Sequence, residues 1–579
     1  MFLRRKFQFS GNICHNFAVT SNIDTKTYQM KDSITSIGDA IRCNGADMAV
    51  LCLAALYLIS AKVHGNVVSW TMLSDALPYV LLYAVARLFF FLSYRKMTLL
   101  VHAPLCIWTI YESLLGLSQL LGITASGHAE FPMTGTFFNP GPFGGLVSIG
   151  LAASLAYLCG HKKFISAKIP FRENVSGYLL SGLSVLAVVS GVLVLPASMS
   201  RAGWLGLAVS MAVLLFRRIP ALGWIRAHRI WTLGICVLCA ALIAGTFMIK
   251  RDSAFGRFHI WEMEARVIAS SPLTGVGPGL ASGAYGQVQG EYFSDACRPE
   301  SRIRVAGCPE YAFNEYLKVG METGVPGLLL SVLIVLLVIK RLITNGSVLG
   351  YAMISLAVFA YFSYPLSIPS LACLTAVLLA SSGFTCSFPK GLTLQSAFIA
   401  VLSVAFMLTG PSRELRSDAG KDYLSARQWV GMELYDDAVA ELSPLYRQMN
   451  HNSGYLYDYG YSLYKSGKYE ESLMVLRQGA VISSDPMFHN IIGRCLEAMG
   501  DMHGAEKEYM LSHHMVPCRL YPLVLLMDMY ISRGRTDDAV AVGEKIMSMP
   551  VNERHRPMLR MKMETKEKLS YLRKDSNEE

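Results

Sequence analysis

The first 410 residues alternate between long apolar runs and short polar connections. A membrane-spanning α-helix needs about 20 predominantly apolar residues, and eleven runs approach or exceed that length. They are residues 46–62, 73–92, 98–123, 142–159, 176–196, 202–216, 230–249, 325–341, 348–364, 367–384 and 393–409. Because a helix satisfies its own backbone groups in lipid, the pattern predicts an all-α protein with about eleven spans.

The pattern changes after Pro411, where charged residues return and short sequences repeat. The segments ELYDDAVAEL, GKYEESLMVL, GDMHGAEKEY and GRTDDAVAVG align with one another. Their small residues recur at spacings of 34, 33 and 34, at Ala438, Ser472, Ala505 and Ala539. This period is typical of tetratricopeptide repeats, in which helix pairs stack into an α-solenoid. The simplest role of such an array is to dock a protein partner.

These patterns divide the chain into four regions. Residues 1–45 are polar and lack the apolar core of a signal peptide, so they are predicted to be a cytoplasmic segment. Residues 46–410 form the membrane domain, which contains a long polar loop at 250–322. The repeats occupy 419–554, and a charged tail follows at 555–579.

Composition agrees with a multi-pass membrane protein. Hydrophobic residues make up 53% of the chain and charged residues only 16%, which is too apolar for an ordinary soluble protein. The net charge of +10 resides in short loops rather than in a basic patch interleaved with aromatic residues, so no nucleic-acid partner is expected. The thirteen cysteines show no His/Cys spacing typical of zinc sites, and no metal is expected.

The distribution of Lys and Arg sets the orientation. Alternate connections are basic, and the short loops between them hold almost no cation except Arg201. The basic set comprises Arg95, Lys96, Lys162, Lys163, Lys168, Arg172, Arg217, Arg218, Arg226, Arg229, Lys340, Arg341 and Lys390. Basic loops face the cytoplasm, so the N-terminus is predicted inside. An odd number of spans then places the C-terminus and the long loop outside.

Four polar segments on the predicted outer side hold the candidate site residues. They are residues 134–145, 198–207, 252–280 and 307–327. In the first, TGTFFNPGPFGG, Asn139 and Pro140 predict a turn before a helix. In the second, SMSRAGWLGL, Arg201 is either a snorkelling side chain or an anion clamp. A guanidinium binds phosphate oxygens in pairs and keeps its charge.

The third segment, DSAFGRFHIWEMEARVIASSPLTGVGPGL, is predicted to begin with an amphipathic helix. Arg257, Trp261 and Glu264 share one stripe of that helix, whereas His259 and Arg266 lie on another. Such a helix offers cations to a lipid-linked anion, although an ordinary surface helix has the same pattern. The glycines that follow lack the preceding strand and the GK[ST] of a phosphate loop, so nucleotide binding is not expected.

The fourth segment, GCPEYAFNEYLKVGMETGVPG, runs without a break into an apolar run. Glu310, Asn314, Glu315 and Glu322 therefore lie at the junction between a polar turn and a membrane helix. Polar groups at such a junction can face a water-filled cavity. A carboxylate that is partly buried at an interface can have a raised pKa and accept a proton.

In this order, TGTFFNP, SRAGWLGL, GRFHIW, SPLTGVGPG and AFNEYLKVGMETGVPG resemble the O-antigen ligase and polymerase superfamily of bacterial inner-membrane glycosyltransferases. The likeness covers roughly residues 130–345. It implies transfer of a glycan from undecaprenyl diphosphate to an acceptor hydroxyl, on lipid A-core or a similar molecule, at the periplasmic face. It implies no metal or other cofactor.

The resemblance also suggests roles for individual residues. Arg201 and Arg257 are candidates for binding the diphosphate, and Arg266, Asn314 and Asn139 are further candidates for substrate binding. Many relatives have a histidine directly before the motif asparagine, whereas this chain has Phe313. The usual base is therefore missing, and the candidates to replace it are Glu315, Glu310 and His259.

Two other function classes fit the same sequence. A repeat-unit polymerase or a protein O-oligosaccharyltransferase uses a different acceptor, and the repeats suit recruitment of a protein acceptor. A non-catalytic scaffold would use the membrane domain only as an anchor. An oxidising periplasm would also permit disulfides between Cys297 and Cys308 and between Cys495 and Cys518, although free thiols fit equally well.

Overall fold

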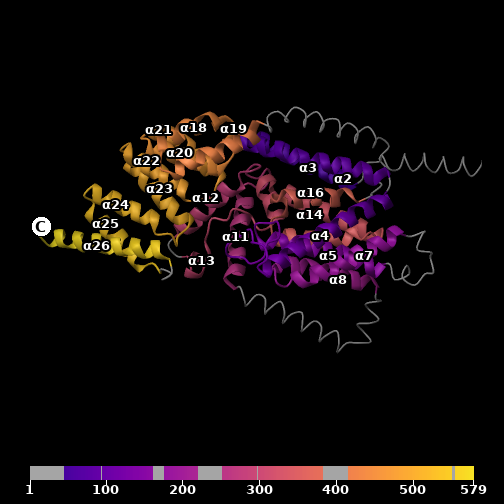
Figure 1. Ribbon diagram of the computed structural model, residues 1–579. Helices are drawn as coiled ribbons and strands as arrows, with labels where there is room; N and C mark the ends of the chain where they lie inside the picture. The colour runs from indigo at the N-terminus through magenta and orange to yellow at the C-terminus, as the bar shows by residue number, and fades with distance from the viewer. Residues whose placement is uncertain are drawn as a thin grey trace, which may run out of the picture.

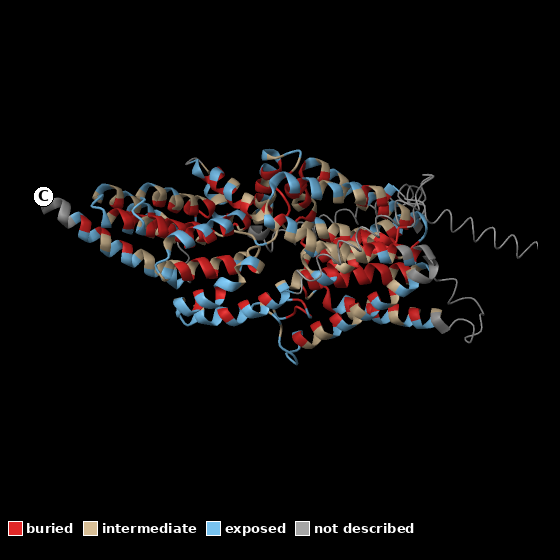
Figure 2. Cartoon of the chain, turned by 90° about the horizontal axis from the view of Figure 1, so that it is seen from above, coloured by how far each residue is buried: buried red, intermediate tan, exposed pale blue. Residues whose placement is uncertain are grey.

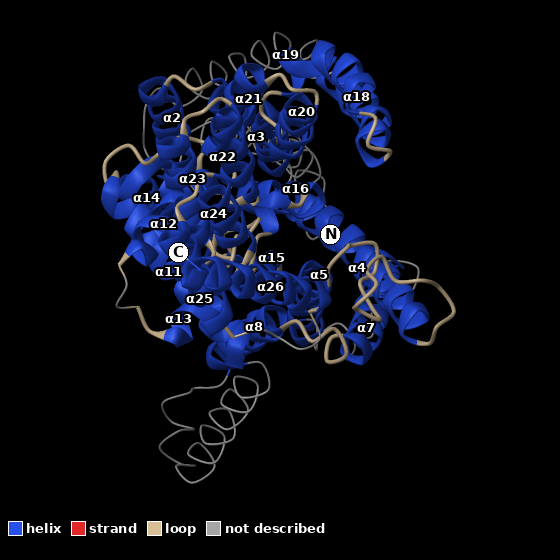
Figure 3. Cartoon of the chain, turned by 90° about the vertical axis from the view of Figure 1, so that its left-hand side faces the viewer, coloured by secondary structure: helices blue, strands red, loops and turns tan. Residues whose placement is uncertain are grey.

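The computed structural model describes residues 45–160, 175–218, 251–382, 415–550 and 555–578, apart from residues 93, 296 and 297. Every regular element in these ranges is helical, as Figure 3 shows. In Figure 1 an apolar bundle lies at one end and the C-terminal helices at the other, with α11, α12 and α13 between them. The predicted all-α class is confirmed for the described part of the chain.

Nine of the described helices build the apolar bundle. They are α2 (Gly45–His64), α3 (Val67–Leu92), α4 (Tyr94–Leu120), α5 (Pro140–Gly160), α7 (Val175–Val194), α8 (Arg201–Arg218), α14 (Glu315–Thr344), α15 (Leu349–Phe362) and α16 (Pro369–Ala380). Each coincides with an apolar run predicted from the sequence. The runs at 230–249 and 393–409 lie outside the described residues.

Six helices of the described part are long and apolar enough to cross a membrane: α2, α3, α4, α5, α7 and α14. The other three bundle helices differ because α8 has arginines at both ends, while α15 and α16 have only 14 and 12 residues. Large apolar side chains remain exposed on the outside of the bundle, for example Leu179 and Leu193 on α7 and Leu329 on α14. Such a surface suits contact with lipid.

Helix α5 forms the centre of the bundle. Most of its residues are buried, and Figure 2 shows buried residues gathered inside the bundle with exposed ones outside. Its glycines allow close packing, since a Cβ at Gly145 would lie 2.5 Å from the Phe359 ring on α15. A Cβ at Gly203 on α8 would lie 2.5 Å from the Gly144 carbonyl oxygen. Small residues of this kind let membrane helices approach each other.

A kink divides α14 into a polar first part and an apolar second part. Gly324 has φ 79° and ψ −174°, a conformation outside the helical region. The segment after α11 holds the kink, because the Val276 amide donates to the Met321 carbonyl and the Val325 amide donates to the Pro272 carbonyl, both at 2.8 Å. The glycines of SPLTGVGPG thus pack against the backbone of α14: a Cβ at Gly275 would overlap Glu322 and Thr323.

The segment between the bundle and the C-terminal helices consists of α11 (Arg251–Ser270), α12 (Ala281–Ser294) and α13 (Glu300–Val305). It belongs to the loop predicted at 250–322. The 3-10 turn η2 (Pro365–Ser367) joins α15 to α16 beside it. These short elements surround the beginning of α14, where the fourth polar segment lies.

The C-terminal part consists of consecutive helices that pack in pairs. Residues 415–431 are helical and precede α18 (Tyr435–Leu442), η3 (Ser443–Leu445), α19 (Tyr446–Met449), α20 (Ser453–Lys465), α21 (Tyr469–Ile482), α22 (Met487–Ala498), α23 (Met502–Met515), α24 (Tyr521–Ser532), α25 (Thr536–Ser548) and α26 (Arg556–Glu578).

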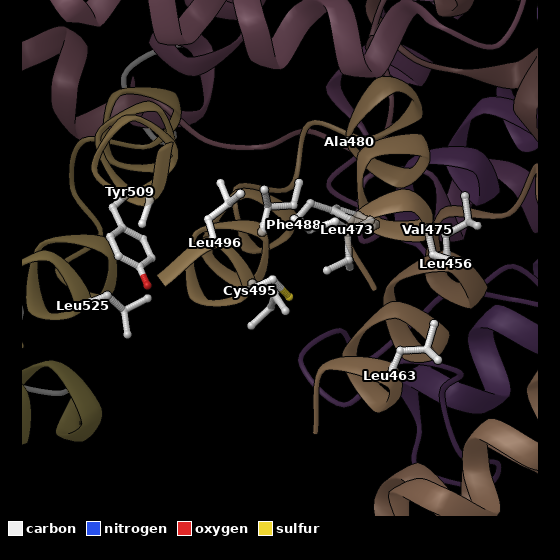
Figure 4. Packing of buried hydrophobic residues seen from close by; sticks show 14 of the residues in the cluster. Leu456, Leu463, Leu473, Val475, Ala480, Phe488, Cys495, Leu496, Tyr509 and Leu525 are labelled. Atoms are coloured by element: carbon white, nitrogen blue, oxygen red, sulfur yellow. The ribbon is translucent and has the colours of Figure 1, made fainter. Parts of the chain in front are cut away.

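The repeated small residues lie inside the C-terminal helices. All four are fully buried: Ala438, Ser472, Ala505 and Ala539. Figure 4 shows the core that they help to close, with Leu463, Phe488 and Tyr509 among its buried side chains. The glycines between paired helices have positive φ, as at Gly467 and Gly500, which suits a helix end. The tetratricopeptide assignment itself stays a prediction.

The charged tail predicted at 555–579 contains the helix α26. Its Leu569 and Leu572 are buried in the C-terminal core, and a Cβ at Gly543 on α25 would lie 2.7 Å from Leu569. The helix therefore covers the last pair, α24 and α25, as a capping element does in a stacked array.

The C-terminal helices pack directly on α12 along a stripe of glycines. Gly283, Gly286 and Gly290 lie on one face of α12, and their neighbours are Val481, Ser484, Leu511 and Met515 of the C-terminal part. The Ser282 hydroxyl donates to the Ser484 hydroxyl at 3.3 Å. We call this contact the α12 seam. It connects the C-terminal helices to the loop segment rather than to the membrane helices alone.

Adding one methyl group at Gly283 should separate the C-terminal helices from α12. A Cβ at Gly283 would overlap the backbone carbonyl of Val481, which can move only if α21 moves with it. We expect Gly283→Ala to accelerate tryptic release of a C-terminal fragment from the full chain in mild detergent. Gly182→Ala on α7 is the control, since no atom lies within 4 Å of its Cβ and alanine favours a helix. Equal release rates in the two variants would contradict the α12 seam.

The disulfides considered from the sequence are not formed among the described residues. Cys308, Cys495 and Cys518 are free thiols, and Cys297 lies outside the described residues. Cys495 is buried in the C-terminal core and donates to the Ser472 hydroxyl at 3.4 Å. Cys308 instead accepts from the Arg519 guanidinium at 3.3 Å. Pairing of Cys495 with Cys518 is therefore wrong for this structure, because Cys495 faces the helix core.

Candidate active site

Arg201 lies close enough to Arg257 to affect the pKa of the Arg257 guanidinium. Arg201 is the first residue of α8, and Arg257 lies in the first half of α11. Burial lowers the pKa of Arg257, and the neighbouring charge of Arg201 lowers it further, while Tyr364 acts in the opposite direction. A guanidinium remains protonated despite such shifts. Two cations that repel each other form a natural binding site for an anion such as a diphosphate.

The packing of α5 against α8 explains the position of Arg201. The Ser200 hydroxyl donates to the Gly141 carbonyl at 3.1 Å, so the beginnings of α5 and α8 lie side by side. Asn139 fixes the same corner, because its side chain accepts from the Gly141 amide at 2.8 Å. Asn139 thus has a local role at the start of α5. The amino ends of helices also add partial positive charge near Arg201.

Arg257 lies over an aromatic cluster at the edge of the candidate site. Its guanidinium carbon is 5.5 Å from the centre of the Phe313 ring. Phe313 in turn packs edge-to-face on Tyr364 at 5.4 Å, and Tyr364 stacks on Tyr311 at 4.1 Å. Phe313 has φ 53°, in the left-handed region that costs a non-glycine residue energy. The position that relatives fill with histidine is therefore occupied by a constrained aromatic ring beside the arginine.

A cavity of about 190 Å³ lies next to this cluster. Its walls come from α11, α12, the segment 309–314, the beginning of α14 and the turn after α15. The carboxyl, amino and side-chain amide groups in its described lining belong to Glu264, Glu310, Asn314, Glu315, Lys318 and Glu322. The fourth polar segment thus lines a cavity, as its position at the start of a membrane helix predicts. The volume is below the roughly 300–1,000 Å³ of pockets for drug-sized ligands.

Two of the sequence candidates in the cavity have structural partners. Asn314 caps α14, because its side-chain oxygen accepts from the Tyr316 and Leu317 amides at 3.0 and 3.1 Å. Glu315 accepts from the Leu366 amide at 2.7 Å and so connects α14 to η2. The candidate base Glu315 is buried, and one of its oxygens is already engaged by the backbone.

Glu322 connects three parts of the fold. It accepts from the Tyr57 hydroxyl of α2 at 2.9 Å and from the Gly279 amide at 3.1 Å. The Ser60 hydroxyl donates to the Glu322 backbone carbonyl at 2.7 Å. Glu322 therefore positions the beginning of α14 against α2 and the glycine segment.

Glu310, the second candidate base, is exposed and lies beside the aromatic cluster. Burial raises the pKa of Tyr311 to about 12, and the Glu310 carboxylate contributes through its charge and a hydrogen bond. Burial also raises the pKa of Tyr364, which Glu310 raises further and Arg257 lowers. The carboxylate of Glu310 and the cation of Arg257 therefore both lie near enough to influence Tyr364.

The remaining sequence candidates on α11 face away from the cavity. His259 is fully buried, and its Nε2 lies 3.0 Å from the Gln289 side-chain oxygen. Burial lowers the pKa of His259, against a smaller opposing effect of Gln289. Arg266 is half-exposed and lies 3.4 Å from Glu262. Neither His259 nor Arg266 lines the cavity.

Glu264 is a cavity residue that was not selected from the sequence. It shares a stripe of α11 with Arg257 and Trp261, and that stripe is the signal by which it could have been found. Trp261 packs against Tyr361 and Phe362 of α15, with ring centres at 5.4 and 5.8 Å. The stripe therefore faces the bundle and the cavity, whereas the His259 stripe faces α12.

Comparison with known proteins gives a family match that covers this region. Residues 186–332 match the family model described as O-antigen ligase, whereas no curated protein matches the chain. The matched segment covers about a quarter of the chain and contains Arg201, Arg257 and most of the cavity lining. Together with the membrane-spanning helices, the match supports a membrane enzyme of the ligase or polymerase type.

Proposed function

We propose that this O-antigen ligase-type domain transfers a glycan from undecaprenyl diphosphate to an acceptor hydroxyl at the periplasmic face of the bacterial inner membrane. The observation that carries the proposal is that Arg257, which Arg201 influences electrostatically, lies over Phe313, a residue of the cavity lining. Both arginines lie within the segment that matches the ligase family. A lipid-linked diphosphate is the anion that a membrane enzyme of this type would hold there.

The chemistry requires charge stabilisation at the leaving group. The acceptor oxygen forms a bond to the anomeric carbon, and the bond from that carbon to the diphosphate oxygen breaks. The electron pair leaves with the diphosphate, so negative charge grows on the phosphate oxygens. Fixed guanidinium groups stabilise that charge most when they are already in place before the reaction. The acceptor hydroxyl must lose its proton to a base within hydrogen-bond reach.

The charged residues at the two ends of α8 and α14 support the proposed orientation of the chain in the membrane. Arg201 begins α8, whereas Arg217 lies near its far end. Glu315 begins α14, whereas Lys340 and Arg341 lie near its far end. The candidate site therefore lies at the opposite ends of these helices from Arg217, Lys340 and Arg341, as expected if those cations face the cytoplasm. The C-terminal helices pack on α12, on the site end of the bundle.

A protein O-oligosaccharyltransferase is the second candidate, and the α12 seam favours it. Ser282 belongs to the cavity lining and also contacts Ser484 of the C-terminal helices. The Ser484 hydroxyl also donates to the Pro309 carbonyl at 3.4 Å. A protein bound by the C-terminal helices would therefore be held near the cavity. A repeat-unit polymerase would use the growing glycan as its acceptor, and a scaffold would use none.

Comparison of glycan profiles on lipid and on protein, with and without the chain, tests these functions. We expect a deletion strain to accumulate lipid-linked glycan and to lose long chains from its lipopolysaccharide. Normal lipopolysaccharide with unglycosylated envelope proteins would instead indicate the oligosaccharyltransferase, and shortened glycans on every acceptor would indicate the polymerase. Unchanged glycans on all acceptors would contradict an enzymatic role. Complementation with the full chain must restore the profile.

A further inference from the structure

The carboxyl group of Glu264 is buried against the cavity, and one of its two oxygens has no hydrogen-bond partner among the described residues. Glu264 is 1% exposed and belongs to the cavity lining. Its Oε2 atom has no hydrogen-bond partner among the described residues. Buried polar atoms are nearly always satisfied, and an unpaired buried carboxylate is costly. A group retained under these conditions needs an explanation beyond stability.

The other carboxyl groups of the cavity are engaged or exposed. Glu315 accepts from the backbone of η2, and Glu322 accepts from Tyr57 and the glycine segment. Glu310 is exposed at the side of Tyr311. Within the described lining, Glu264 therefore combines deep burial with a carboxylate oxygen that remains available for a new hydrogen bond.

The position of Glu264 relative to Arg257 suits a transfer reaction. The two residues are seven positions apart on α11, which corresponds to about 10 Å along a helix with a rise of 1.5 Å per residue. They occupy the same stripe, with Trp261 between them fixed against α15. One stripe of a rigid helix thus presents a cation for the leaving group and a carboxyl group for the attacking hydroxyl.

The charge of the lining limits the kind of acceptor. The cavity presents four carboxyl groups and one lysine, together with the stacked rings of Tyr311 and Tyr364. An acceptor that carries phosphate at this point would meet the negative charge of four carboxyl groups, which the single lysine of the described lining, Lys318, does not balance. A neutral group with hydroxyls, no larger than a single sugar ring, suits the size of the cavity and its hydrogen-bond acceptors.

We propose, on the basis of the function proposed above, that the cavity binds an uncharged hydroxyl-bearing acceptor group and that Glu264 is the general base of the transfer. The acceptor hydroxyl donates to Oε2 and gives up its proton as its oxygen bonds to the anomeric carbon. The diphosphate leaves with the electron pair of the broken bond. Glu264 then holds the proton until solvent removes it, and the carboxylate is restored.

Burial favours this role because it raises the pKa of Glu264 well above its usual value of 4.5. A base is most effective when its pKa is near the working pH. The titratable and charged groups that line the cavity with Glu264 are Tyr285, Glu310, Tyr311, Glu315, Lys318, Glu322 and Tyr364. Most are carboxyl groups or tyrosines, which add no positive charge that would lower the pKa again.

The test is Glu264→Gln in the full chain. The purified variant is added to membranes of the deletion strain, which supply the native donor and acceptor. General base catalysis contributes about 10²- to 10⁴-fold, so we expect a loss of at least 100-fold in turnover, with binding of undecaprenyl diphosphate unchanged. Glu262→Gln is the matched control on the same helix, because Glu262 pairs with Arg302 at 2.7 Å outside the cavity. It should retain the wild-type rate.

The pH profile separates catalysis from a structural role. The wild-type rate should rise with pH as Glu264 loses its proton, and the residual rate of Glu264→Gln should lack that rise. An unchanged rate with an unchanged profile in Glu264→Gln would overturn the assignment of the base while the proposed function stands. Absence of transfer by the wild-type chain would instead contradict the proposed function itself.

The melting temperature provides a second readout, because Glu264→Gln should lower the transfer rate without lowering the melting temperature. A carboxyl group with a raised pKa in the folded state binds more protons when folded than when unfolded, so its contribution to stability is present below about pH 4.5 and is lost as the pH rises through the folded pKa. Glu264→Gln removes that loss and should melt at the same or a higher temperature at neutral pH. A lower melting temperature with a proportional loss of rate would show a structural residue and overturn the proposal.

Discussion

Arg257→Ala should abolish transfer while leaving the protein folded and inserted. The guanidinium lies over Phe313 and beside Arg201, and burial already lowers its pKa, so removing it relieves repulsion rather than breaking an ion pair. Loss of one preorganised donor to a developing anion costs about 10²- to 10³-fold in turnover. We therefore expect at least a 100-fold loss of transfer in membranes of the deletion strain, without a lower melting temperature.

Arg201→Ala should have a similar effect for the same reason. Because both arginines are proposed to hold one diphosphate, the double variant should lose much less than the product of the two single losses. Arg257→Lys keeps a positive charge but not the planar fork that binds two phosphate oxygens, so its rate should fall between those of wild type and Arg257→Ala. Binding of undecaprenyl diphosphate should weaken in each variant.

Arg266→Ala is the matched control on the same helix. Arg266 is half-exposed, lies 3.4 Å from Glu262 and contacts the Tyr292 ring, away from the cavity. Its removal should change the transfer rate by less than about twofold, since exposed ion pairs contribute roughly 0–1 kcal/mol. A loss as large as that of Arg257→Ala, or full activity in both Arg201→Ala and Arg257→Ala, would refute the diphosphate clamp.

The apolar pattern predicted the helices better than it predicted the spans. Runs of apolar residues imply helices because the backbone must satisfy itself in lipid, and nine of the eleven runs coincide with described helices. The length and the charge of a helix then decide whether it can cross the membrane. The run at 348–364 becomes α15 with 14 residues, and its continuation forms Ser363, Tyr364 and η2 beside the cavity. An apolar run alone does not show where such a turn interrupts a helix.

Only part of the candidate site could be predicted, because the sequence does not show how helices pack against one another. Helical periodicity shows which residues of α11 share a stripe, but it cannot show which stripe faces a cavity. His259 was therefore selected from the sequence as a candidate base and Glu264 was not, and packing against α15 and α12 separates their two stripes. Arg201 and Arg257 are 56 positions apart in sequence, so their proximity followed from the family resemblance rather than from any local pattern.

The contact between the glycine segment and α14 could not be predicted from local sequence. SPLTGVGPG indicates turns because of its glycines and prolines, but not the surface on which those turns lie. In the structure Gly275, Val276 and Pro272 pair with the backbone of α14 around its kink. This non-local contact explains how the polar first part of α14 can continue directly into its apolar second part. The kink turns the first part of α14 toward the cavity and the second part toward lipid.

Gly324→Ala should therefore damage both stability and transfer. Gly324 has φ 79° and ψ −174°, a region used almost only by glycine, and a side chain there costs about 1–3 kcal/mol. Its Cβ would also lie 2.6 Å from the Pro272 carbonyl oxygen and 2.8 Å from the Leu273 carbonyl carbon, and such overpacking costs about 1–3 kcal/mol more. We expect a clearly lower melting temperature of the full chain in detergent.

The remaining folded molecules should also transfer more slowly. Relief of the clash would shift the first part of α14, which carries Glu315, Lys318 and Glu322 in the cavity wall, and a displacement of about 1 Å at a reacting group can cost 10²-fold. We expect at least a tenfold lower rate per folded molecule. Gly346→Ala is the matched control, because Gly346 has φ 68° but no atom lies within 4 Å of its Cβ. It should lose about 1–2 kcal/mol from backbone strain and keep the wild-type rate. If Gly324→Ala matched this control in both rate and melting temperature, the kink would have no part in positioning the cavity.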